Sequence, residues 1–126
     1  MKDIDMERHL VVTGEPASKA NGRRVVRIGG VSRSIKSKKA LSYAGAFLLQ
    51  AKPVEPLMEG ELAMTLHIYY ASQRPDLDES LILDLLQGIL YKNDRQVRER
   101  HVYHYIDKLN PRAEIWVRPR DWPVPI

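Results

Sequence analysis

The chain contains no cysteine among its 126 residues. A disulfide framework, thiol catalysis and a zinc site built from thiolates are therefore excluded. Long apolar runs are also missing, because no stretch approaches the roughly 20 apolar residues that a membrane-spanning helix needs. The opening residues are mostly charged and lack the apolar centre of a signal peptide, so we expect a cytoplasmic protein with no membrane partner.

Acidic residues are missing from one long stretch, between Glu15 and Glu55. That stretch instead holds a series of basic residues: Lys19, Arg23, Arg24, Arg27, Arg33, Lys36, Lys38, Lys39 and Lys52. Such a cluster attracts polyanions and supplies affinity through counterion release, which favours a nucleic-acid partner. A solvated basic face that binds nothing explains the cluster about equally well.

The length predicts a single domain over residues 1–126 with its own core. Runs with β-type composition or alternating pattern occupy residues 9–13, 24–28, 31–35, 61–71, 97–106 and 113–117. Two of these runs flank Gly29 and Gly30, which predicts a hairpin that we call the basic hairpin, residues 23–36. The last two runs are interpreted as a second hairpin that turns at residues 108–111.

Two segments have apolar residues at helical spacing. The first covers residues 38–50 and is followed by Pro53, and the second covers residues 79–87 and ends near Gly88. With the strands above, this order predicts an α+β fold, in which two helices pack on a mixed β-sheet.

Carboxylates follow the predicted strand 61–71 at two alternate positions, Asp76 and Asp78, and Asp94 lies beyond the second helix. Oxygen ligands of this kind suit Mg²⁺, which binds one or two carboxylates together with waters and phosphates. Two of the three aspartates also have a simpler interpretation: Asp78 as a helix N-cap and Asp94 as a turn residue. Asp76 has a weaker one, because a capped helix does not need two acidic residues. In a basic chain, the pattern favours metal-assisted chemistry on nucleic acid, and we call residues 74–97 the acidic segment.

The acidic segment contains Arg74-Pro75-Asp76-Leu77-Asp78, then Gly88 and Tyr91, and then Asn93-Asp94-Arg95-Gln96-Val97. This combined pattern resembles the RusA family of Holliday-junction resolvases, which are small phage and prophage endodeoxyribonucleases. The resemblance implies a homodimer in a bacterial host cell that cuts branched DNA, a four-way junction, with two symmetric nicks during recombination and repair. It further implies that Asp76, Asp78 and Asp94 are catalytic and bind Mg²⁺, with Mn²⁺ as a possible substitute.

The chain departs from the family pattern at the position of a catalytic lysine, where Ile82 is the nearest residue. Lys92 and Arg95 flank Asp94 and are our candidates for that role, with Lys92 placed among the catalytic residues. Expected DNA contacts are Arg74, Arg95, Arg23, Arg24, Arg27, Arg33 and Lys36. Arg74 is explained about equally well as an ordinary surface charge or as an ion-pair partner of Asp76.

Two other functions remain open. The missing lysine favours a catalytically inactive or slow protein of the same fold that still binds DNA junctions. A phage interaction or assembly protein is the third possibility, and it predicts little affinity for DNA. His67, His101 and His104 do not form a metal-ligand set and are interpreted as structural or surface residues.

Overall fold

The computed structural model describes residues 7–17, 23–28, 31–36, 38–71 and 79–120. Four of its strands form one mixed sheet, in the order β1-β6-β4-β5. Their bounds are β1 Arg8–Thr13, β4 Leu62–Tyr70, β5 Val97–Ile106 and β6 Arg112–Pro119. Strand β4 is central and pairs on both edges, parallel to β5 and antiparallel to β6. The predicted α+β class is therefore confirmed.

The predicted second hairpin is wrong, although both of its strands exist. Strands β5 and β6 are not paired with each other, because β4 lies between them. The connection after β5 crosses the end of β4, where the Asp107 amide donates to the Tyr70 carbonyl at 2.8 Å. The physical reason is burial: most side chains of β4 and those at alternate β6 positions are buried, whereas β5 is mostly exposed and suits a sheet edge.

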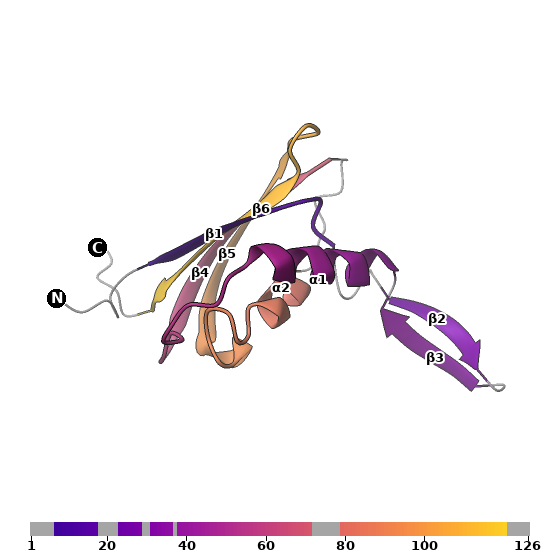
Figure 1. The fold of residues 1–126 in the computed structure, drawn as a ribbon, viewed down its shortest axis with the longest axis horizontal. Helices are drawn as coiled ribbons and strands as arrows, with labels where there is room; N and C mark the ends of the chain where they lie inside the picture. The colour runs from indigo at the N-terminus through magenta and orange to yellow at the C-terminus, as the bar shows by residue number, and fades with distance from the viewer. Residues whose placement is uncertain (1–6, 18–22, 29–30, 37, 72–78, 121–126) are drawn as a thin grey trace.

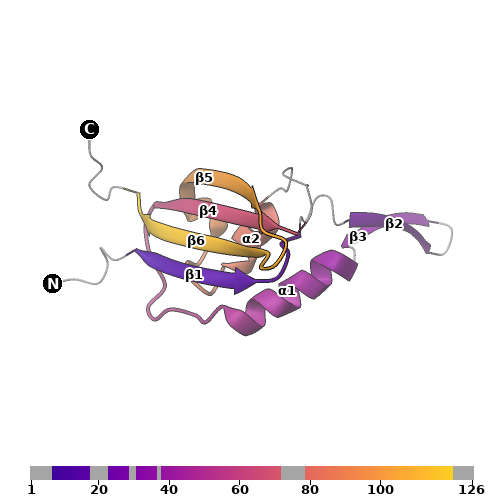
Figure 2. The same ribbon diagram turned by 90° about the horizontal axis from the view of Figure 1, so that it is seen from above.

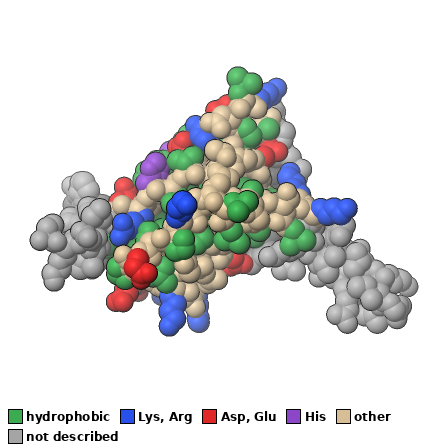
Figure 3. Space-filling view, in the orientation of Figure 1, with side chains coloured by type: hydrophobic (Ala, Val, Ile, Leu, Met, Phe, Trp, Pro, Cys, Tyr) green, Lys and Arg blue, Asp and Glu red, His purple; other side chains and the backbone are tan. Residues whose placement is uncertain are grey.

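Both helices cover the same face of the four-stranded sheet (Figures 1 and 2). Helix α1, Lys38–Gln50, buries Ala40, Tyr43 and Phe47 against this face, and its exposed surface carries apolar side chains (Figure 3). The inner positions of β4 are all buried: Leu62, Met64, Leu66, Ile68 and Tyr70. The fold thus has two layers with the core between them.

Helix α2, Ser80–Leu85, is shorter than the predicted helix over residues 79–87. The chain leaves the helix through Leu86, whose amide still donates to the Ile82 carbonyl, and then turns at Gly88, where φ is +83°. The glycine marks the end of the helical region as expected. The predicted cap Asp78 lies outside the described residues. Neither α1 nor α2 combines the length and apolarity that a membrane-spanning helix requires.

The predicted basic hairpin is confirmed. Strands β2, Arg23–Ile28, and β3, Val31–Lys36, form a separate antiparallel two-stranded sheet. It extends away from the four-stranded sheet, beyond the start of α1 (Figures 1 and 2). The hairpin is therefore an arm that projects from the domain near the start of α1.

Two glycines with open space around them should respond oppositely to alanine. Gly45 lies inside α1, and a methyl group there meets no heavy atom within 4 Å. Gly45→Ala should stabilise the protein by about 0.5–1 kcal/mol, because alanine has the higher helix propensity. Gly88→Ala should destabilise it by about 1–2 kcal/mol, because φ of +83° strains an L-residue even where space is open. Urea unfolding of the two variants measures both effects, and equal signs would contradict the assigned conformations.

Candidate active site

Of the three predicted metal ligands, the structure describes Asp94. It is the first residue of a short 3-10 helix, η2, Asp94–Gln96, between α2 and β5. Asp76, Asp78 and the neighbouring Arg74 lie outside the described residues. In the part of the chain that is described, no cluster of three His, Cys, Asp or Glu side chains could hold a metal ion. The three-aspartate site therefore stays a prediction.

A capping box fixes the backbone around Asp94. The Asn93 carboxamide oxygen accepts from the Arg95 amide at 2.9 Å, and the Gln96 side-chain oxygen accepts from the Asn93 amide at 3.0 Å. These reciprocal bonds satisfy backbone donors that the start of a short helix leaves free. Asn93 and Gln96, which belong to the motif that carries the resemblance, thus determine the backbone conformation at Asp94.

Gln96 also ties this turn to the rest of the domain. Its side-chain nitrogen donates to the carbonyls of Met58 and Gly60, at 3.0 and 3.1 Å. On the other side, the Asp94 amide donates to the Gln87 side-chain oxygen at 2.9 Å, which links Asp94 to the turn after α2. Asp94 is therefore held from two directions before any ligand is present.

Tyr91 lies behind this turn and is fully buried. Its hydroxyl donates to the Leu83 carbonyl at 2.8 Å, so the aromatic residue of the motif joins α2 to the Asp94 turn. Burial raises the pKa of the Tyr91 hydroxyl, the carboxylates of Asp94 and Asp84 raise it further, and Arg100 opposes them.

Sequence reasoning missed Arg100. In β5 it is paired in register with Met64 of β4, and its Nη1 donates to Glu79 Oε2 at 3.3 Å. Glu79 is the N-cap position of α2 and follows Asp78 directly in the chain. The sequence feature that could have identified Arg100 is the alternation of side chains along β5. It places Arg100 on the same inner face as Val102, where a charged residue needs a partner.

The position of the missing family lysine and the two candidates for its role differ in solvent exposure. Ile82 is 0% exposed and packs in the core, so this position supplies no cation to the Asp94 turn. Lys92 and Arg95 are both exposed beside Asp94. The Arg95 side chain lies 3.4 Å from the Asn93 carboxamide oxygen, within its own turn.

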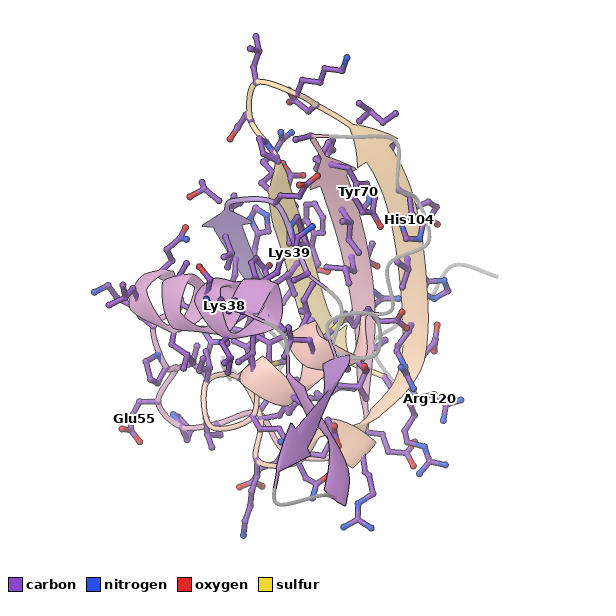
Figure 4. All side chains as sticks on the ribbon, turned by 90° about the vertical axis from the view of Figure 1, so that its right-hand side faces the viewer. Lys38, Lys39, Glu55, Tyr70, His104 and Arg120 are labelled. Atoms are coloured by element: carbon purple, nitrogen blue, oxygen red, sulfur yellow. The ribbon has the colours of Figure 1, made fainter. Side chains whose placement is uncertain are left out.

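The histidines interact with neighbouring side chains. His104 Nδ1 lies 2.8 Å from the Tyr70 hydroxyl, and Figure 4 shows the two rings side by side on β5 and β4. His101 pairs with Glu99 at 2.9 Å. His67 contacts the rings of Tyr103, Tyr105 and Trp116 on the opposite face of the sheet. These contacts give each histidine a structural partner.

Replacement of Gln96 tests how the Asp94 turn is held. Gln96→Ala removes its bonds to both sides of the turn and should destabilise the domain by about 1–3 kcal/mol, because partly buried backbone groups lose their partners. Amide hydrogen exchange at residues 92–96 should accelerate most. Arg95→Ala is the control, since its side chain is exposed, and exchange should then stay nearly unchanged. Equal protection in both variants would show that the capping box is not what orders the turn.

Comparison with known proteins places these features in context. The family model described as endodeoxyribonuclease RusA matches residues 13–118, which run from the end of β1 to β6. No curated protein matches the chain. The matched region includes strands β4 and β5, all but the last residue of β6, both helices, the basic hairpin and the whole acidic segment, whereas β1 contributes only its last residue. Since the match covers most of the chain, this protein belongs to the RusA family of endodeoxyribonucleases.

Proposed function

We propose that this protein is a Mg²⁺-dependent endodeoxyribonuclease that resolves four-way DNA junctions by paired symmetric nicks. Family membership supports nuclease action on branched DNA. The observation that carries the proposal is the Glu79–Arg100 pair. Strands β4 and β5 are parallel, so the chain must return along the sheet between them. Glu79 contacts Arg100, which is the fourth residue of β5. The start of α2 therefore lies near the beginning of β5, the strand end that follows Asp94 in the chain.

The proposed metal ligands are Asp76, Asp78 and Asp94. Asp78 precedes Glu79 in the chain, and Asp94 stands in the ordered turn before β5. Carboxylate oxygens are the donors that Mg²⁺ prefers, and Mn²⁺ accepts the same set. When bound, the metal would polarise the phosphodiester and lower the pKa of the attacking water. The chain itself contributes preorganisation, because the Asp94 backbone is fixed by Gln87 and the capping box.

The proposed assembly is a homodimer. A two-fold axis relates the subunits of a symmetric dimer, and a four-way junction has near two-fold symmetry. Such a dimer presents one active site to each of two opposed strands, which accounts for paired nicks.

The proposed DNA contacts lie in the basic hairpin and in the acidic segment, at Arg74 and Arg95. The hairpin register pairs Arg23 with Lys36, Arg27 with Ser32 and Val26 with Arg33. Because residues alternate between the faces of a strand, positions 23, 27 and 36 share one face and positions 24 and 33 the other. An arm that extends from the domain can follow a phosphate backbone that the sheet does not reach.

A second candidate is a junction-binding protein of the same fold without catalysis, or with slow catalysis. The observation in its favour is that α2 has the buried Ile82, and not a lysine, nearest the position of the family's catalytic lysine. Retention of all three aspartates opposes it, because uncompensated carboxylates beside DNA repel phosphate.

Cleavage of a labelled, mobile four-way junction tests the proposal directly. The protein should produce symmetric nicks with Mg²⁺ or Mn²⁺ and none with chelator. Asp76→Asn and Asp94→Asn should each abolish cleavage and keep or strengthen junction binding, because each removes a ligand and a negative charge. Asp107→Asn is the matched control, since Asp107 pairs with Arg112 in the turn between β5 and β6. Tight binding without nicks by the parent would favour the non-catalytic candidate, and full activity of Asp94→Asn would exclude it as a ligand.

Salt dependence of junction binding tests the basic hairpin. Replacing Arg23, Arg27 and Lys36 with alanine should weaken binding and lower the slope of log K against log salt by about 0.9 per lost phosphate contact. Replacing Arg24 and Arg33 probes the other face of the hairpin in the same way. Lys52→Ala and Lys108→Ala are exposed controls outside the hairpin. Unchanged slopes in both hairpin variants would remove the arm from the DNA interface.

A further inference from the structure

Arg100 occupies an unusual position for a charged residue. It lies on the face of β5 that is turned toward the helices, opposite the buried Met64. Its side chain is 48% exposed, and its partner Glu79 is 23% exposed. The guanidinium therefore reaches the edge of the core and remains accessible from solvent beside the start of α2.

The surroundings of Arg100 are acidic. It pairs with Glu79, and it acts on Tyr91 against the carboxylates of Asp94 and Asp84. Tyr91 joins α2 to the segment that leads into the Asp94 turn, because its hydroxyl donates to the Leu83 carbonyl and its backbone precedes that turn. Arg100 is thus a cation that the fold holds at the start of α2, through its bond to Glu79.

Its chemistry suits a phosphate. A guanidinium presents five N–H donors in a planar fork that matches two phosphate oxygens, and a single bond to Glu79 uses one of them. A DNA phosphate that approaches the start of α2 meets repulsion from the Glu79 carboxylate, and the guanidinium of Arg100 beside it offsets that repulsion. A pre-positioned guanidinium also stabilises charge that develops during phosphodiester cleavage, without reorganisation at that moment.

We propose that Arg100 binds a DNA phosphate beside the start of α2 and supplies the cation that the buried Ile82 does not. This inference rests on the proposed function. Ile82 is buried in the core, whereas Lys92 and Arg95 are exposed and no ion pair holds either of them among the described residues. The competing explanation is purely structural: Arg100 acts only through Glu79, by fixing the start of α2.

Four variants separate the two explanations: Arg100→Gln, Arg100→Lys, Glu79→Gln and the Arg100→Gln/Glu79→Gln pair. Arg118→Gln is the charge-matched control, since β6 places Arg118 on the face away from the helices. Junction affinity is measured over a salt series with Ca²⁺ in place of Mg²⁺, and single-turnover cleavage is measured with Mg²⁺. Thermal unfolding of each variant separates folding defects from changes in binding.

Arg100→Gln should lower the salt slope of binding by about 0.9, as expected for one lost phosphate contact. It should also slow single-turnover cleavage by about 100-fold, the order of effect seen when one transition-state donor is removed. Arg100→Lys should keep the salt slope and recover part of the rate. Glu79→Gln should leave the slope unchanged, and Arg118→Gln should change neither quantity.

Equal losses in Arg100→Gln and Glu79→Gln, with no further loss in the double variant and no change in either slope, would overturn the proposal in favour of the structural role. Wild-type slope and rate in Arg100→Gln would overturn it outright and leave the nuclease assignment standing. If the parent binds junctions without cutting them, the slope still decides the role of Arg100. If the parent neither binds nor cuts, the proposed function itself fails, together with this inference.

Discussion

The burial of β4 is the constraint on which the rest of this fold depends. Its inner side chains are all nearly inaccessible to solvent, and its backbone pairs along both edges. A strand buried in this way can occupy only the centre of a sheet, since its backbone groups must find partners on both sides. Strands β5 and β6 are therefore divided between its two edges. The parallel pairing with β5 then requires the connection to return along the sheet, and that return carries α2 and Asp94.

This connection carries α2 and the Asp94 turn back to the end of the sheet where β5 begins. The acidic segment begins beyond the end of β4, and β5 starts at the opposite end of the sheet. The bond from Arg100 to Glu79 fixes the start of α2 against β5. The Gln87 side chain accepts a hydrogen bond from the Asp94 amide and so fixes the connection a second time. Tyr91 fills the space behind both points. The start of α2 and the Asp94 turn are thus each fixed at this end of the sheet, the first by an ion pair and the second by hydrogen bonds.

The two faces of the sheet have different roles. The inner face forms the core with α1 and α2, while the outer face carries rings that contact one another across all four strands. His9 stacks on Trp116 with ring centroids 4.6 Å apart, and Tyr69 stacks on Tyr105 at 4.8 Å. Arg112 covers the Tyr69 ring at 3.7 Å. Because these rings stack on each other across neighbouring strands, they stabilise the sheet as cross-strand pairs.

The sequence alone determined the local features. The alternation of residues 61–71, the paired glycines of the basic hairpin, the apolar spacing over residues 38–50 and the turn at Gly88 depend on neighbours a few residues away, so each could be predicted. Tertiary structure decided what depends on distant partners. It inserted β4 between β5 and the strand predicted to form its hairpin partner, because burial outweighed chain proximity. It placed Ile82 in the core and brought Arg100 to Glu79, because the register of a parallel pair, set by a long connection, decides which side chains meet.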